Sequence, residues 1–181
     1  MPGTDKTRRV ATTAALDVRP RRAEDLAACI ALAAEVHRVD GYPSFLGDGG
    51  FDRFVDPEDA LGTWVATLDG DVVGNVALRP RSAPSSVTAA EHALGVPASG
   101  LGFVARLMVS PRARRRGIAR RLLDTVEAEG RRRGLVPVLD VVTRDVAAIA
   151  LYRASGWQDL GEHAFTMRNG EQLALQVFAK P

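Results

Sequence analysis

The chain has 181 residues, 46% apolar and 25% charged, which is the composition of an ordinary globular protein and a length that suits one core better than two. Its formal net charge is +2, yet nine arginines fall between residues 112 and 133 against Asp124, Glu127 and Glu129. A local basic patch of this kind favours a phosphorylated ligand or a nucleic acid over a generally cationic protein.

Three further features narrow the class of protein. The single cysteine, Cys29, can neither form an internal disulfide nor complete a zinc site. The three histidines, His37, His92 and His163, show no metal-ligand spacing, so we expect no metal. The sequence contains no signal-peptide apolar core and no apolar run of about 18 residues. We therefore expect a cytoplasmic protein with no membrane partner.

The N-terminal half predicts a tail, helices and a hairpin. Residues 1–15 lack periodicity and are predicted to form a mobile tail, which leaves a domain over 16–181. The elements expected next are a strand at 16–19, a helix from 24 to about 38, a short helix within 51–61 that starts at Pro57, and strands at 63–68 and 71–78 around an Asp69-Gly70 turn. Residues 79–100 read as a long connection with a helical turn near 88–94.

The loop at 40–50 is open to two interpretations. It is rich in turn formers and aromatic residues, so it could recognise a small ligand. It could equally be a plain connector with Tyr42 and Phe45 packed beneath it.

The C-terminal half predicts one parallel strand pair. The expected elements are a strand at 101–109, a helix from 118 to about 131–133, an apolar strand at 135–142, a helix at 145–155, and hairpin strands at 157–168 and 171–178. A strand, a helix and a second buried strand in succession form a βαβ unit, whose two strands run parallel. We therefore predict an α+β fold with a central mixed, mostly antiparallel sheet, one parallel βαβ unit and helices on both faces.

A basic, glycine-containing turn joins the strand at 101–109 to the following helix. A helix N-terminus offers unpaired backbone N–H groups and a partial positive charge, and a bare glycine lets an anion approach them. The turn therefore predicts a phosphate site whose donors are the N–H groups of Arg114, Arg115, Arg116, Gly117, Ile118 and Ala119. For Arg120, Arg121 and Arg131–Arg133, a solvated basic helix face is the better interpretation.

Two stretches resemble the motifs of one enzyme family. Arg114-Arg-Arg-Gly-Ile-Ala119 resembles the Arg/Gln-x-x-Gly-x-Gly/Ala motif of the GNAT superfamily of N-acetyltransferases. Ala148-Ile-Ala-Leu-Tyr-Arg-Ala-Ser-Gly-Trp157 resembles its second motif, and both lie in the expected order on the expected elements. The resemblance extends over 16–178. It implies that acetyl-CoA is the acyl donor and that a primary amine of a small molecule or peptide attacks it directly.

The resemblance also implies roles for particular residues. The pantetheine arm would pair with Leu107, Met108 and Val109, and the N–H groups near Leu107 and Met108 would polarise the acetyl carbonyl. Tyr152 would protonate the departing thiolate, unless it is an aromatic packing residue. Asp145 stands where the family has an asparagine that contacts pantetheine.

The general base is left unassigned. Many relatives carry a glutamate early in the strand before the first motif, where this chain has Phe103. Groups elsewhere that could accept the proton are Glu91, His92, His37, Asp40 and Asp140.

Two alternative functions remain at this stage. One is a non-catalytic CoA-binding regulatory domain of the same fold. The other is a nucleic-acid-binding domain that uses the arginines at 112–121, which the 6% aromatic content and the absence of a base-stacking pattern disfavour, so we expect no nucleic-acid partner. Homodimers are common in the family, so a homodimer is also compatible with the resemblance.

Overall fold

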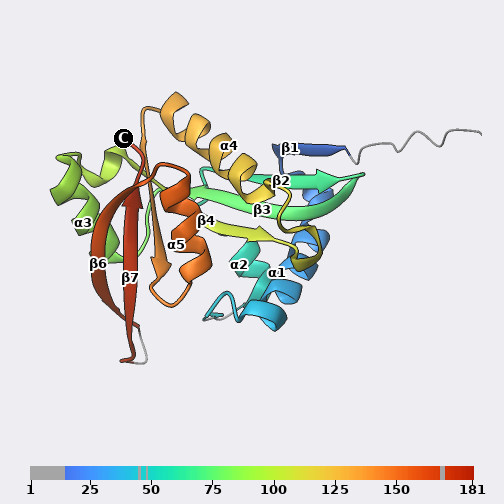
Figure 1. Cartoon of the computed structure of the whole chain (residues 1–181), viewed down its shortest axis with the longest axis horizontal. Coiled ribbons are helices and arrows are strands. Elements are labelled where there is room, and N and C mark those ends of the chain that lie inside the picture. The colour runs from blue at the N-terminus through green and yellow to red at the C-terminus, as the bar shows by residue number, and fades with distance from the viewer. Residues whose placement is uncertain (1–14, 45, 48, 168–169) are drawn as a thin grey trace, which may run out of the picture.

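Seven strands form one mixed sheet in the order β1-β2-β3-β4-β5-β7-β6 (Figure 1). The computed structural model describes residues 15–44, 46–47, 49–167 and 170–181. The strands are β1 (Leu16–Pro20), β2 (Gly62–Leu68), β3 (Asp71–Arg79), β4 (Leu101–Val109), β5 (Val136–Val142), β6 (Gln158–Thr166) and β7 (Gln172–Ala179). Neighbours are antiparallel except β4 and β5, which confirms the predicted parallel unit.

Helices cover both faces of the sheet, as predicted (Figure 1). On one face, α4 (Ile118–Arg132) and α5 (Val146–Ala154) share a core with β2–β5 and β7. On the other, α1 (Leu26–Asp40) and α2 (Gly50–Val55) pack against β2 and β4, and α3 (Pro84–Leu94) packs against β4, β5 and β7. Short 3₁₀ turns precede α1, β4 and α4 at Ala23–Asp25, Ala98–Gly100 and Pro111–Ala113. None of the described helices has the length and apolarity needed to cross a membrane.

The helix α4 is fixed by one apolar face. Leu122, Leu123 and Val126 have no exposed surface and pack against the sheet, whereas the arginines of the helix point outward. Burial of a leucine side chain stabilises a fold by about 2 kcal/mol, so three such residues hold the helix firmly on the strands. This packing positions the N-terminus of α4, and with it the basic turn, at the end of β4.

Two helices differ from the sequence expectation. The segment predicted as a long connection contains α3, which begins with proline in its first turn and ends at Gly95 (φ +64°). Its weak helix formers are held by tertiary packing, because Ala90 is fully buried against Leu101 and Phe103. The predicted start at Pro57 is wrong: α2 ends at Val55, since burial of Phe54 and Val55 against α1 fixes it earlier in the chain.

The strands β4 and β5 pair over three residues and then separate. Their register joins Leu101–Phe103 to Val136–Val138 and extends no further along the strands. A bulge in β4 against β3 lies beyond the last residue that pairs with β5, where Arg106 has a left-handed backbone (φ +57°). We call the diverging segments, Val104–Val109 of β4 and Leu139–Val142 of β5, the fork.

The predicted tail falls almost wholly outside the described residues. Ala15 is described, and its N–H donates a hydrogen bond to the Asp69 side chain at 3.0 Å.

Candidate active site

Within the fork, the edge of β4 that faces β5 carries backbone N–H donors. The Ser110 N–H donates to the Val73 carbonyl of the neighbouring strand at 2.8 Å. Donors alternate in direction along a strand, so Met108 also directs its N–H to β3, while Leu107 and Val109 direct theirs into the fork. Of the three residues expected to pair with a ligand, Leu107 and Val109 therefore offer their N–H groups to it. Met108 is 2% exposed and packs beneath α1.

The basic turn continues directly from this edge. After Pro111–Ala113, Arg114 is extended, and Arg115 and Gly117 are both left-handed (φ +63° and +73°). The first helical bond of α4 runs from the Arg121 N–H to the Gly117 carbonyl at 3.1 Å. Throughout residues 114–120, all of them described, no backbone N–H donates to another backbone group. The predicted donors from Arg114 to Ala119 thus lie at a helix N-terminus, and their N–H groups have no backbone acceptor.

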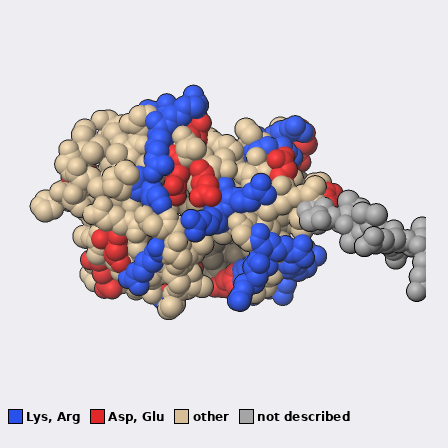
Figure 2. Space-filling model, turned by 45° about the horizontal axis from the view of Figure 1, so that its top comes forward, with Lys and Arg blue, Asp and Glu red and all other residues tan. Residues whose placement is uncertain are grey.

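Most of the arginine side chains are engaged elsewhere in the protein. Arg114 pairs with Asp40, and Arg112 with Glu35 at 3.0 Å. Arg120 and Arg121 donate to backbone carbonyls, and Arg132 and Arg133 both pair with Glu129 at 2.6 Å. Figure 2 shows the basic side chains of this face in separate groups with acidic ones among them. The predicted phosphate site would therefore depend on the backbone of the turn more than on the number of arginines.

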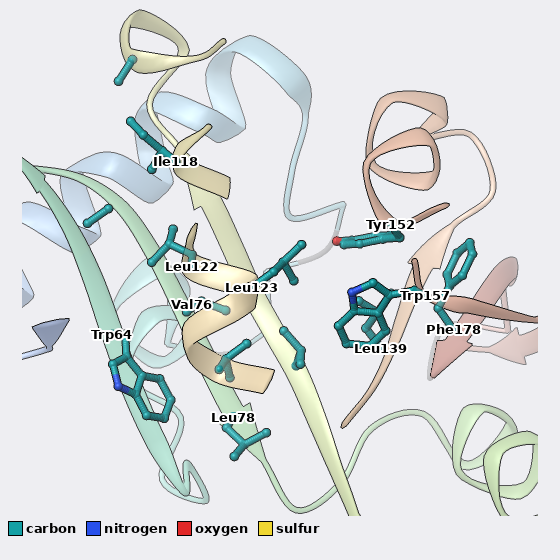
Figure 3. Packing of buried hydrophobic residues seen from close by; sticks show 14 residues of the cluster. Trp64, Val76, Leu78, Ile118, Leu122, Leu123, Leu139, Tyr152, Trp157 and Phe178 are labelled. Carbon is teal, nitrogen blue, oxygen red and sulfur yellow. The ribbon is translucent and has the colours of Figure 1, made fainter. Parts of the chain in front are cut away.

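Tyr152 lies on α5 beside the fork. It is 7% exposed, and its ring packs against Trp157 and Phe178 with centroids 6.2 and 5.7 Å apart. Its hydroxyl points away from the Phe178 ring (Figure 3). Burial raises the pKa of the phenol, and the neighbouring Tyr42, Asp145 and Asp140 raise it further. Tyr152 is thus protonated at neutral pH and can donate a proton, while its ring has the packing role that the sequence left open.

Asp145 caps α5. Its Oδ1 accepts a hydrogen bond from the Ala148 N–H at 3.1 Å, which satisfies one of the free donors at the helix start. An aspartate performs this capping as well as an asparagine does, so the departure from the family pattern leaves the local structure intact. The negative charge of Asp145 is near enough to raise the pKa of Tyr152.

The five groups considered as bases have different surroundings. Glu91 accepts the Ala98 N–H at 2.7 Å, the His37 ring nitrogen lies 3.0 Å from the Pro43 carbonyl, and Asp40 pairs with Arg114. His92 is exposed on the last turn of α3. Asp140 lies within the fork, two residues beyond the last β5 residue that pairs with β4, and accepts a hydrogen bond from Ser82 at 2.6 Å.

Arg106 of the fork and the neighbouring Asn75 were not assigned a role from the sequence. Arg106 is at the bulge of β4, and Asn75, fully buried on β3, donates to the Arg106 carbonyl at 3.1 Å. Tyr42 extends from the loop after α1 to the Phe54 ring, 5.7 Å between centroids. Burial raises the pKa of Tyr42, while nearby Arg106 opposes the shift. Phe45, expected beside Tyr42, lies outside the described residues. A bulge depends on strand register, which no local pattern in this sequence indicates.

The chain belongs to the acetyltransferase (GNAT) family, whose family model matches residues 29–157. A curated relative, named IAA acetyltransferase, from Azospirillum brasilense, is 43% identical over 63 residues, which are 34% of this chain and 41% of the relative. The match thus spans about two-fifths of that protein's length.

Solved structures share the fold over nearly the whole chain. A GCN5-related N-acetyltransferase from Kribbella flavida superposes with a TM-score of 0.66 at 23% identity, covering 92% of this chain and 98% of that one. A GNAT family acetyltransferase from Brucella melitensis in complex with acetyl-CoA gives 0.61 at 19% identity, covering 92% and 89%. The observed sheet and helices are therefore those of the family.

The two ends of α4 provide a matched test of the phosphate site. Gly117 and Gly134 both have φ +73° and open space where a Cβ would be, so substitution imposes a similar backbone strain at each. We predict that Gly117→Glu abolishes the thermal stabilisation by acetyl-CoA and weakens its binding about 100-fold or more, because a carboxylate would occupy the anion site. Gly134→Glu should bind like the wild type. Equal binding by the two variants in calorimetric titration would place the site elsewhere.

Proposed function

We propose that the protein transfers the acetyl group of acetyl-CoA to a primary amine within a ternary complex. The observation that carries this proposal is the continuity of two rows of free donors. The fork-facing N–H groups of β4 lead directly into the free N–H groups of the basic turn at the start of α4. Family membership supports the activity, and the acetyl-CoA bound to the Brucella melitensis structure supports the choice of donor.

The donor would bind along this path without a metal. The pyrophosphate would accept hydrogen bonds from the turn Arg114–Ala119, where the helix dipole also favours a negative charge. The pantetheine amides would extend along the fork-facing edge of β4, bonded by Leu107 and Val109. An N–H group of this edge would polarise the acetyl carbonyl and stabilise the oxyanion that forms on attack. Asp145, at the start of α5, would contact pantetheine from the opposite side of the fork.

Two residues of the fork are suited to the proton transfers. An alkylammonium with a pKa of about 10 must lose its proton before it can attack. Asp140 supports the role of proton acceptor because it is a carboxylate within the fork, oriented by Ser82. Tyr152, protonated and close to Asp145 and Asp140, would donate its proton to the CoA thiolate as the C–S bond breaks.

The proposal includes the broader expectations drawn from the sequence. We propose residues 16–181 as the catalytic domain, the cytoplasm as its compartment because acetyl-CoA is the donor, and a small molecule or peptide as the acceptor. A homodimer is compatible with this scheme and is not required by it.

A two-stage experiment tests the activity. Thermal unfolding is measured with and without acetyl-CoA, and thiol release is then followed across a panel of primary amines. We expect a concentration-dependent rise in Tm and amine-dependent release of CoA. A stabilised protein that acetylates none of the amines would instead be a CoA-binding regulator. No response to acetyl-CoA, with salt-sensitive binding to random DNA, would favour a nucleic-acid-binding domain.

Separate variants test the two proton-transfer roles. Tyr152→Phe removes the hydroxyl and leaves the packed ring, so we predict a fall in kcat of about 100-fold with unchanged acetyl-CoA binding. Asp140→Asn keeps the hydrogen bond to Ser82 possible but cannot accept a proton, so kcat/KM for the amine should fall by a similar factor. The recovery of Asp140→Asn activity at high pH, where the free amine prevails, would support the base role. Wild-type kcat in either variant would remove that residue from the mechanism.

A further inference from the structure

We propose that Arg106 binds a carboxylate of the acceptor, so that the substrate is a small amino acid or a similar aminocarboxylate. This inference rests on the proposed acetyl transfer and specifies its acceptor. Its basis is a charge imbalance in a hollow on the α1–α2 face of the sheet.

The hollow has a volume of about 280 Å³, a size suited to a small molecule. It is formed by α2 and the segment after it, by the end of β3 and by the bulge of β4. Its lining residues are Arg53, Asp56, Pro57, Glu58, Asp59, Arg79, Arg81 and Arg106. Arg106 connects the hollow to the fork, because this residue lies in the segment of β4 that no longer pairs with β5.

Each carboxylate of the hollow already has a cationic partner. Asp56 pairs with Arg21, from outside the lining, and Glu58 pairs with Arg53 at 2.7 Å. Asp59 pairs with both Arg79 and Arg81 at 2.8 Å. Arg79, with Arg81, holds the pKa of Asp59 at about 2, so these pairs persist at neutral pH. The acids are therefore fully engaged by other arginines.

Arg106 is the arginine of the lining that has no carboxylate partner among the described residues. Among the described carboxylates, none lies within ion-pair distance of it, and its Nε is buried with no hydrogen-bond partner. Its Cζ lies 4.1 Å from the centre of the Phe54 ring, and burial lowers its pKa. A half-buried cation with a free donor is costly, and a carboxylate that binds it in two places recovers that cost. The left-handed backbone at the bulge is a further strain of the kind that functional sites retain.

Tyr42 lies near both Arg106 and Asp140, the proposed proton acceptor. The charges of Arg106 and Asp140 both act on the Tyr42 phenol and shift its pKa in opposite directions, so all three side chains share one region. A molecule with its carboxylate on Arg106 could direct its amine toward Asp140 and the acetyl group. A peptide N-terminus has its own carboxylate converted to an amide, so Arg106 would favour free aminocarboxylates over peptides.

Matched acceptors test the inference in the intact protein. We compare amino acids with their decarboxylated amines and their carboxamides, for example phenylalanine, phenethylamine and phenylalaninamide. We expect kcat/KM to be about 10- to 100-fold higher for the acid, the effect of a charge-assisted hydrogen-bonded pair. The carboxamide's amine has a lower pKa than the acid's and is more fully deprotonated at neutral pH, so amine basicity cannot produce a preference for the acid over the carboxamide.

Variants of Arg106 separate recognition from folding. Arg106→Met keeps an unbranched side chain over Phe54 and loses the charge, so KM for the acid should rise about 10- to 100-fold while kcat/KM for the decarboxylated amine stays within about 2-fold. Arg106→Lys should restore part of the preference. The matched control is Arg81→Gln, because Arg81 lines the same hollow but is exposed and paired with Asp59. Its preference should remain that of the wild type.

Several results would overturn the inference. Equal turnover of acid and decarboxylated amine by the wild type, or faster turnover of peptides, would show that no carboxylate is recognised. An equal loss with both acceptors in Arg106→Met would assign Arg106 a structural role. In each case acetyl transfer itself would stand, whereas the absence of turnover with every amine would refute the proposed function as well.

Discussion

The whole site depends on the separation of β4 from β5 after three paired residues. Unpaired strand edges are costly when buried, because each N–H and C=O that has left water needs a partner. In this fold the edge is left open while the strands are still anchored, β4 by β3 and β5 by β7. A ligand with amides of its own can complete the pairing, which explains why an extended acyl donor suits the gap.

The bulge at Arg106 links this open edge to the acceptor side. It shifts the register between β3 and β4, and the fully buried Asn75 fixes it through the Arg106 carbonyl. The same distortion directs the Arg106 side chain onto Phe54, on the face that α1 and α2 cover. In the proposed scheme, donor and acceptor would thus reach the fork from different directions, as direct attack requires. The turn after β4 and α5 close the donor side with free N–H groups and with Tyr152.

The sequence indicates the proposed donor site more clearly than the proposed acceptor site, for a physical reason. Gly117 and the turn around it form a pattern of neighbouring residues, and such a pattern can be recognised from the sequence alone. The strand 101–109 was predicted with its observed bounds because a continuous apolar run marks a buried strand. By contrast, α3 is stabilised by residues distant in the sequence, such as Val138 and Val177. Nothing in the sequence distinguishes Arg106 from the other arginines. It lacks a carboxylate partner only because other arginines pair with the nearby acidic residues in the folded chain.

The central claim is that one path of backbone donors, from the fork edge through the basic turn, holds the acyl donor. Amide hydrogen exchange, resolved by residue and measured with and without acetyl-CoA, tests this most directly. The account predicts slower exchange at Leu107 and Val109 and at Gly117–Ala119, with little change at Met108, whose N–H already faces β3. Protection confined to other parts of the chain, with these amides exchanging as before, would contradict it.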